Sequence, residues 1–479
     1  MSQGKAHLGI VIVGHVDAGK STTTGRLLFE LGGMSERDLA KLKKEAQELG
    51  KESFLFAFFM DKSKDERARG VTIQCCTREF FTDSYHYTII DAPGHRDFIK
   101  NMISGASQAD VALLMVPANK GGFETSIAKG NHKKGEIQGQ TRQHARLCHL
   151  LGIEQLIVGI NKMDDKSVNY AEDRYKEIKG EVDKMLTKIG YKTKKIPFIP
   201  LSGFKGDNLK DKSTNMAWWK GFEVKIKKDK VSGVTLVDAL EKVVKPPKRA
   251  TNKPFRMPVS GVYKIKGVGD VITGRIEQGS IAPGVNVKFY PTGCGGNAFS
   301  VEMHHKTVEK AGCGDNVGVN VKKLPKENMP HVGDVMCIDD ANADPSPPRA
   351  AAEFTALVFV QDHPGKLSCG KEEKDKKTGT MNVKGGFTPS IHIRTAKAPC
   401  QMIAINWKMG KSTSNAKVEG VPYIEAGDQA EVVFRPRMPI VVCPFDDCKP
   451  LGRIAAMDSN SLIMLGKVTK VTYVAKAAK

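Results

Sequence analysis

A short glycine-containing segment near the N-terminus has residue types and spacing suited to binding phosphate. It runs Gly14-His15-Val16-Asp17-Ala18-Gly19-Lys20-Ser21. An apolar run at residues 8–13 precedes it, and residues 22–31 after it are predicted to be helical. A strand, then G-x-x-x-x-G-K-S, then a helix is the arrangement of a phosphate-binding loop. The sequence therefore predicts a nucleotide site here.

The residue types in this loop match the chemistry of a bound triphosphate. Gly14 and Gly19 let the backbone turn so that successive N–H groups point at one anion. The N-terminus of the following helix adds partial positive charge. Lys20 can reach the β and γ phosphates, and the Ser21 hydroxyl can bind Mg²⁺.

A second polar segment, Asp91-Ala92-Pro93-Gly94-His95, follows the apolar run 86–90. An aspartate at a strand end can hold Mg²⁺ through its water shell, and Thr72 supplies a second hydroxyl. Gly94 allows its N–H to approach a γ phosphate, which places His95 beside an attacking water. The predicted metal-binding residues are Ser21, Thr72 and Asp91, and the predicted catalytic residue is His95. The predicted phosphate-binding residues are Gly14, His15, Val16, Asp17, Ala18, Gly19, Lys20, Ser21, Thr22 and Gly94.

The sequence Asn161-Lys162-Met163-Asp164 indicates which base is bound. Guanine presents two donors on one edge, and a single carboxylate such as Asp164 accepts both. Adenine has no such pair, so it would leave the carboxylate desolvated and unpaired. The Lys162 stem can lie on the base face, and a segment after the next strand can close the far side. The predicted guanine-binding residues are Asn161, Lys162, Asp164, Ser202, Gly203 and Phe204.

The elements that carry these residues alternate between strands and helices. Short apolar runs at 8–13, 86–90, 111–116, 156–160 and 198–201 are typical of parallel strands covered on both faces. Helical stripes lie between them, so residues 1–241 predict a doubly wound, mostly parallel α/β domain. Residues 120–140 are rich in glycine and lysine, and we expect a mobile surface insertion without a functional role.

The pattern changes after a proline-marked basic linker at 242–254. Short alternating segments punctuated by Gly, Pro and Asn predict all-β structure, either barrel or sandwich. A second break at 339–349 separates two such domains, 255–342 and 350–479, and residues 371–384 form a charged loop in the second.

The composition favours a polyanionic partner. Lys and Arg total 74 against 53 Asp and Glu, a formal charge of +21. This excess points first to nucleic acid, although a basic surface without a partner is the alternative. The ten cysteines are scattered and predict reduced thiols in a cytosolic protein. No apolar run approaches the roughly 18 residues that span a bilayer, so no membrane association is expected.

Taken together, these motifs resemble those of translational GTPases. Gly94-His95-Arg96-Asp97-Phe98-Ile99-Lys100-Asn101-Met102 is similar to the elongation factor 1-alpha family, as are Val301-Glu302-Met303-His304-His305 and Gly314-Asp315-Asn316-Val317-Gly318. The chain looks most like the divergent branch of that family, the elongation-factor-like proteins. This resemblance implies a GTPase domain followed by two β-barrel domains, with GTP or GDP and Mg²⁺ as cofactors.

The resemblance also implies a function and further residue roles. Such proteins deliver aminoacyl-tRNA to the ribosomal A site and release it after GTP hydrolysis. Val16 and Val71 would form an apolar gate that holds His95 back. Glu302 would meet the terminal adenosine of the tRNA acceptor end, and Asn316 would lie near the esterified amino acid.

The resemblance implies a cytoplasmic monomer whose partners are aminoacyl-tRNA and the ribosome. It leaves open a guanine-nucleotide exchange factor and actin as further partners. Two alternatives stay open. A sister GTPase could deliver a release or ribosome-rescue factor, and a basic scaffold could bind actin or RNA with incidental GTPase activity.

Overall fold

The computed structural model describes residues 5–48, 50–60, 63–69, 71–73, 75–130, 138–226, 229–303, 306–361, 365–374, 381–459 and 461–475. The chain divides into two compact units, Met1–Pro247 and Lys248–Lys479. Each unit is described by itself, and the division falls inside the predicted linker.

Unit 1 is built on a six-stranded sheet with the order β2-β3-β1-β4-β5-β6. The strands are β1 (Ala6–Gly14), β2 (Cys76–Phe81), β3 (Tyr85–Asp91), β4 (Val111–Pro117), β5 (Gln155–Asn161) and β6 (Phe198–Pro200). All neighbouring pairs are parallel except β2 with β3. The predicted mostly parallel α/β domain is therefore confirmed. Because the ends of β1, β3 and β5 meet at one edge, the three predicted motifs converge there.

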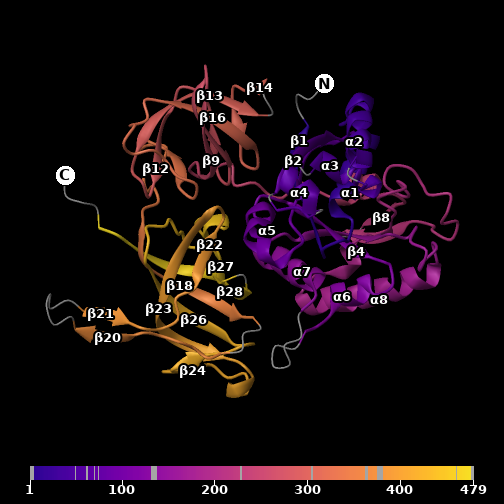
Figure 1. Cartoon of the computed structure of the whole chain (residues 1–479). Helices are drawn as coiled ribbons and strands as arrows, with labels where there is room; N and C mark the ends of the chain where they lie inside the picture. The colour runs from indigo at the N-terminus through magenta and orange to yellow at the C-terminus, as the bar shows by residue number, and fades with distance from the viewer. Residues whose placement is uncertain are drawn as a thin grey trace. The chain divides into compact units, whose positions relative to one another are not determined.

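Helices lie on both faces of this sheet, with α1 to α3 on one side and α6 to α8 on the other (Figure 1). The helices are α1 (Lys20–Glu30), α2 (Glu36–Glu48), α3 (Ala57–Met60), α4 (Lys64–Arg69), α5 (Ile99–Ala106), α6 (Gly122–Ile127), α7 (Gln140–Leu151), α8 (Glu172–Ile189) and α9 (Leu236–Asp238). Single 3-10 turns occur at η1 (Glu52–Phe54) and η2 (Arg96–Phe98), and β7 (Phe222–Ile226) pairs with β8 (Asp229–Gly233).

Two predicted loops contain secondary structure. Within 120–140, α6 forms, and α7 begins at Gln140; residues 131–137 lie outside the described part. Within 371–384, β20 (Lys371–Lys374) pairs with β21 (Met381–Lys384) as the hairpin visible in Figure 1. The prediction that these two segments are loops is therefore wrong for the parts that form α6 and the β20–β21 hairpin.

Unit 2 consists of two closed antiparallel barrels of six strands each, as the resemblance implied. The first barrel contains β9 (Met257–Ile265), β10 (Gly269–Arg275), β12 (Asn286–Tyr290), β13 (Gly295–Met303), β16 (Asn316–Lys322) and β17 (Val335–Ile338). The second contains β18 (Ala351–Val360), β22 (Ser390–Ile393), β23 (Ala396–Met409), β26 (Gln429–Pro436), β27 (Arg453–Asp458) and β28 (Ser461–Tyr473). Pairing of β12 with β13 closes the first barrel, and pairing of β22 with β23 closes the second.

Short strand pairs flank the barrels. They are β14 (Lys306–Thr307) against β13, β24 (Val418–Glu419) against β23, β11 (Ser280–Ile281) with β15 (Ala311–Gly312), and β19 (Leu367–Ser368) with β25 (Tyr423–Ile424). The first barrel encloses one apolar core, and the core of the second barrel also includes Val335 and Cys337 of β17. None of the ten cysteines, all of which lie in the described part of the chain, forms a disulfide. No helix in the described part of the chain is long and apolar enough to span a membrane.

Candidate nucleotide-binding site

A cavity of about 910 Å³ opens at the edge of the unit 1 sheet where the predicted motifs meet. Most of the predicted nucleotide residues line it, while Gly14, Ala18, Asp91, Ser202 and Gly203 lie behind its wall. The lining residues are His15, Val16, Asp17, Gly19, Lys20, Ser21, Thr22, Ser53, Phe54, Ala57, Val71, Thr72, Gly94, His95, Asn119, Gly122, Thr125, Asn161, Lys162, Asp164, Asp165 and Phe204.

The loop between β1 and α1 depends on two glycines. Gly14 has φ +147° and Gly19 has φ +81°, backbone conformations that side chains rarely adopt. A Cβ on Gly19 would also lie 2.4 Å from Asn161 Nδ2. The loop can therefore close against β5 only with glycine at this position.

Lys20 is buried beneath the segment that follows β3. Its Nζ donates to the carbonyl oxygen of His15 at 2.9 Å, and only 7% of the residue is exposed. A Cβ on Gly94 would lie 2.4 Å from that Nζ. Gly94 thus brings the backbone directly over the ammonium, which leaves both groups facing the same part of the cavity.

Two hydroxyl side chains lie close together in the cavity lining, and the buried Asp91 lies near one of them, Ser21, behind the wall. Ser21 Oγ lies 3.1 Å from Thr72 Oγ1. Asp91 is fully buried, and neither of its carboxylate oxygens has a hydrogen-bond partner among the residues described. Burial raises the pKa of Asp91 to about 6, while nearby Ser21 and Lys20 lower it. A buried, unsatisfied carboxylate beside two hydroxyls suits a hard cation.

His95 lines the cavity together with Val16 and Val71. Its side chain is 43% exposed, and Nδ1 lies 3.4 Å from Asp97 Oδ2. The ring also lies 5.9 Å from that of Phe98. The structure therefore brings His95 and the two predicted gate residues to one cavity, with the imidazole held beside Asp97.

At the base end, Asn161 connects two loops. Its Nδ2 donates to Ala18 O at 2.9 Å and to Thr23 Oγ1 at 3.3 Å, and its Oδ1 accepts from Gly203 N at 2.8 Å. Both amide hydrogens are thus used within the protein, so the side chain fixes the position of the loops that it joins. Ser202 has a similar role, since its hydroxyl accepts from Lys205 N at 3.0 Å.

Lys162, Asp164 and Phe204 line the base end directly. Lys162 has φ +65°, an unusual conformation for a residue with a side chain. Phe204 is 41% exposed. These three residues leave a carboxylate, an aliphatic stem and an aromatic ring available to a planar base.

Helix α7 holds the phosphate loop from behind, which sequence reasoning missed. Gln140 Oε1 accepts from Val16 N at 3.1 Å, and His144 Nδ1 accepts from Gly14 N at 3.2 Å. Burial lowers the pKa of His144 to about 3, so its ring is neutral and Nδ1 can accept. The four-residue spacing of Gln140 and His144 places both on one face of a helix, which could have indicated a shared contact. The predicted insertion 120–140 instead ends at Gln140, the first residue of α7.

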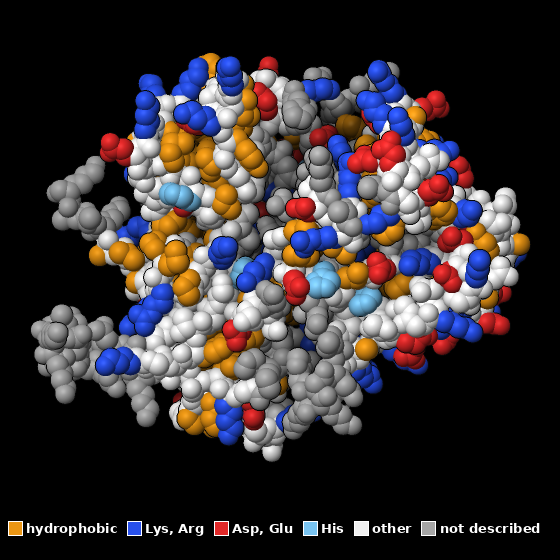
Figure 2. Space-filling view, viewed as in Figure 1, with side chains coloured by type: hydrophobic (Ala, Val, Ile, Leu, Met, Phe, Trp, Pro, Cys, Tyr) orange, Lys and Arg blue, Asp and Glu red, His pale blue; other side chains and the backbone are white. Residues whose placement is uncertain are grey.

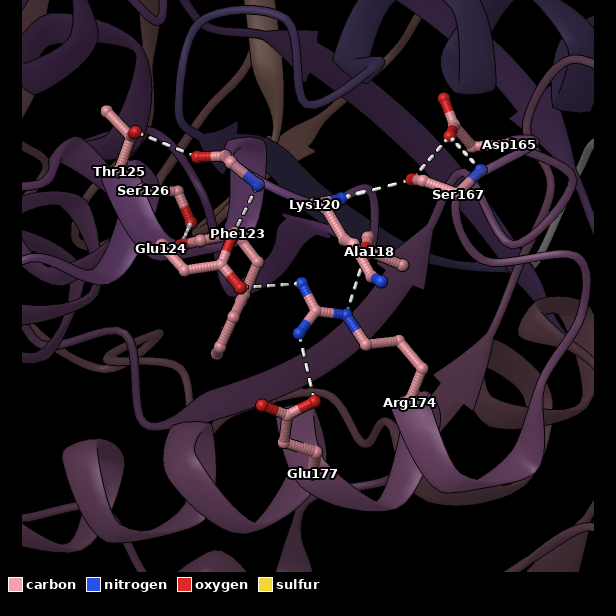
Figure 3. A network of polar contacts seen from close by, with 11 residues as sticks. Ala118, Lys120, Phe123, Glu124, Thr125, Ser126, Asp165, Ser167, Arg174 and Glu177 are labelled. Atoms are coloured by element: carbon pink, nitrogen blue, oxygen red, sulfur yellow. Dashed lines mark hydrogen bonds and ion pairs between the residues drawn. The ribbon is translucent and has the colours of Figure 1, made fainter.

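A second missed feature is the polar network around Arg174 (Figure 3). Its guanidinium donates to Ala118 O at 2.9 Å and pairs with Glu124 and Glu177 at 2.8 and 2.9 Å. The network fixes the start of α6 against α8. Asn119, Gly122 and Thr125 are thereby added to the cavity lining.

The two predicted acceptor-end residues lie on the first barrel. Glu302 pairs with Gly318, and Asn316 lies two residues before Gly318 on β16. Side chains alternate along strands, so Glu302 and Asn316 share a face. Val317 and Val319 point to the core, which makes this the outer face. The Asn316 Oδ1 is buried without a partner among the described residues.

Three family models match the chain in order. The elongation factor Tu GTP binding domain matches residues 5–246, and elongation factor Tu domain 2 matches 269–337. The GTP-eEF1A C-terminal domain-like model matches residues 378–469. Between them, the three matches reach both units.

Similar proteins of comparable length are elongation factors. Elongation factor 1-alpha from Eremothecium gossypii is 43% identical over 479 residues, covering 100% of this chain and 98% of that protein. Elongation factor 1-alpha from Tetrahymena pyriformis is 43% identical over 467 residues, covering 98% of each.

A solved structure shares the fold. The GTPase-like domain of S. cerevisiae Ski7, bound to GTP, aligns with a TM-score of 0.73 over 97% of each chain. Sequence identity there is 17%, so this likeness concerns the fold alone.

Proposed function

Because the chain belongs to the elongation factor 1-alpha family of translational GTPases, we propose that it delivers aminoacyl-tRNA to the ribosomal A site in its GTP-bound state. Hydrolysis to GDP then releases the tRNA. The observation that carries this proposal is 43% identity to an elongation factor 1-alpha over the whole chain, both barrels included. A GTPase domain alone would not distinguish the cargo.

In this proposal the cavity binds GTP. The loop from Gly14 to Thr22 and the Gly94 backbone surround the phosphates, with Lys20 as the cation. Lys162, Asp164 and Phe204 contact guanine, and Asn161, Ser202 and Gly203 hold those loops in place. A carboxylate that accepts both guanine donors would exclude adenine, because adenine leaves it buried and unpaired.

Ser21, Thr72 and Asp91 would hold Mg²⁺. The unsatisfied Asp91 carboxylate and the two hydroxyls 3.1 Å apart fit a hard, oxygen-binding cation. When bound, Mg²⁺ neutralises charge that develops on the phosphate oxygens. Ser21 and Thr72 would orient it directly, and Asp91 through its water shell.

His95 would orient the attacking water. Its ring reaches the cavity wall near Val16 and Val71, which would hold it back until the ribosome repositions it. While the valines keep His95 away from the water, GTP hydrolysis in the free protein would be slow. Hydrolysis would become fast when the ribosome moves His95 into place.

Unit 2 would bind the tRNA. Glu302 and Asn316 on the outer face of the first barrel would contact the acceptor end. Figure 2 shows lysine and arginine side chains spread over the surface, with a group around the upper end of that barrel. Phosphate contacts of this kind carry no sequence information, which suits a carrier of many tRNAs. An exchange factor, actin binding and a monomeric state stay predictions of the resemblance.

Ester protection tests the proposal. The protein loaded with GTP should slow spontaneous deacylation of several different aminoacyl-tRNAs, whereas the GDP-loaded protein should not. Raised salt should weaken the protection, because phosphate contacts release counterions. Absence of protection in both nucleotide states would refute the delivery role and favour a sister GTPase with protein cargo.

A further inference from the structure

Both backbone polar groups of Ile73, the residue after Thr72, are held by side chains from helices. The Ile73 N–H donates to Glu66 Oε1 at 2.9 Å. The Ile73 carbonyl oxygen accepts from Asn101 Nδ2 at 2.8 Å. Glu66 belongs to α4 and Asn101 to α5. The backbone beside Thr72 is therefore clamped between two helices.

The Glu66 side of this clamp is fixed by a reciprocal cap at the start of α4. Glu66 Oε2 accepts from Ser63 N at 3.2 Å, and Ser63 Oγ accepts from Glu66 N at 3.1 Å. Glu66 is only 6% exposed. A carboxylate that is buried and bonded through both oxygens has little freedom to leave Ile73.

The Asn101 side has a second point of attachment. Cys75 Sγ donates to the Asn101 carbonyl oxygen at 3.1 Å. A Cβ on Gly105 would lie 2.6 Å from that sulfur, so α5 provides the space that Cys75 fills. Burial raises the pKa of Cys75 to about 12, which keeps the thiol protonated and able to donate. Ile73 and Cys75 thus each form a hydrogen bond with Asn101 of α5.

We infer that Glu66 and Asn101 are positioning residues, which hold the Thr72 hydroxyl at the metal end of the cavity by clamping Ile73. The clamped residue, Ile73, directly follows Thr72, whose Oγ1 lies 3.1 Å from Ser21 Oγ. Loss of either clamp residue would free the peptide that carries Thr72. This inference rests on the proposed magnesium role of Thr72.

The test is the gain in nucleotide affinity that Mg²⁺ provides. Dissociation constants of a non-hydrolysable GTP analogue are measured for the full chain with Mg²⁺ and with excess EDTA. Asn101→Ala and Glu66→Ala should each reduce the Mg²⁺-dependent gain about tenfold, the effect of one buried hydrogen bond. Glu66→Gln should lose less than Glu66→Ala, because its carbonyl oxygen can still accept from Ile73 N, although its amide nitrogen cannot accept from Ser63 N. The control Lys100→Ala changes an exposed neighbour on α5 and should have no effect.

Hydrogen exchange at the Ile73 amide provides a readout that does not involve the metal. Exchange should accelerate in Glu66→Ala and stay slow in Glu66→Gln. Unchanged exchange in Glu66→Ala, or an affinity loss that is equal with and without Mg²⁺, would overturn the inference.

Thr72→Ala separates this inference from the metal assignment on which it rests. If Thr72→Ala leaves the Mg²⁺-dependent gain intact, the metal role of Thr72 is wrong and the clamp inference falls with it. If Thr72→Ala reduces the gain but Asn101→Ala does not, only the clamp is wrong. If both reduce it, Asn101→Ala should add nothing to Thr72→Ala, and additive losses would contradict the inference.

Discussion

His144 should make unit 1 sensitive to acid, because its imidazole is buried in the neutral form. It is 1% exposed and accepts from Gly14 N at 3.2 Å. Burial lowers its pKa from 6.5 to about 3. Below pH 6.5 the unfolded chain binds a proton that the folded chain does not, so stability falls as pH falls toward 3.

The magnitude follows from the size of that pKa window. At about 1.4 kcal/mol per unit, lowering the pH from roughly 7 to roughly 5 should cost unit 1 about 2 kcal/mol through His144 alone. His144→Asn should remove this loss. The asparagine carbonyl can still accept from Gly14, and it does not titrate. Nucleotide affinity at neutral pH should therefore stay within a few-fold of the unsubstituted protein.

Urea unfolding at the two pH values measures the effect. Trp218 and Trp219 lie in unit 1, and a Trp407→Phe background removes the signal of unit 2. His331→Asn, an exposed substitution in unit 2, serves as the control. If His144→Asn and the unsubstituted chain lose the same stability between the two pH values, the neutral buried imidazole is refuted.

Three further substitutions test the cavity. Asp164→Asn should weaken GTP binding about a hundredfold and favour xanthosine triphosphate, whose ring has a carbonyl where guanine has an amino group; unchanged GTP affinity in a titration would contradict the base assignment. Gly94→Ala would place a Cβ 2.4 Å from Lys20 Nζ and should weaken a GTP analogue about tenfold while affecting GDP less; equal losses in competition binding would refute the γ-phosphate placement. Asn161→Ala removes three hydrogen bonds and leaves Gly203 N unpaired, so the losses in GDP-binding free energy and in unfolding free energy should sum to about 3 kcal/mol. Unchanged GDP affinity and melting temperature would show that the loops do not depend on Asn161.

The sequence predicted the parallel strands well, because a strand buried on both faces is a continuous apolar run. The edge strand β2 was missed, since Cys76–Phe81 contains Thr, Arg and Glu and lacks that pattern. Helix α6 was also missed within a glycine-rich stretch. Its support comes from Arg174, which pairs with Glu124 at 2.8 Å from 50 residues away. Local patterns do not record contacts of this range.

The barrels show a related limit. Alternation of apolar and polar residues indicates strands, but it does not specify which strands pair. Closure of the first barrel depends on β12 pairing with β13 as well as with β17. The residues alone left barrel and sandwich open, and the family resemblance favoured barrels without specifying the strand pairing.

In the cavity, the motifs predicted residues whose types suit the proposed ligand. Lys20, Asp91 and Asp164 carry charges or donors that few other side chains could replace. Gln140, His144, Glu66 and similar supports are ordinary residues whose roles depend on what the fold brings near them. Their roles could not be predicted from residue type. The four-residue spacing of Gln140 and His144 indicates only that both side chains lie on one face of a helix.

Asn161 and Asp91 differ in charge and in how far the protein satisfies their polar atoms. Asn161 bridges two segments as a neutral amide, which donates and accepts at once without burying charge. Asn101 is also a neutral amide, and it donates to the Ile73 carbonyl oxygen. Asp91 is instead fully buried, with both oxygens unsatisfied among the described residues. A buried carboxylate without compensation destabilises the fold at neutral pH, because its ionised form is poorly solvated. The Asn161 amide is thus satisfied within the protein, whereas the Asp91 carboxylate is left available to a bound cation. Binding should stabilise this end of the sheet by relieving that desolvation as well as by adding contacts.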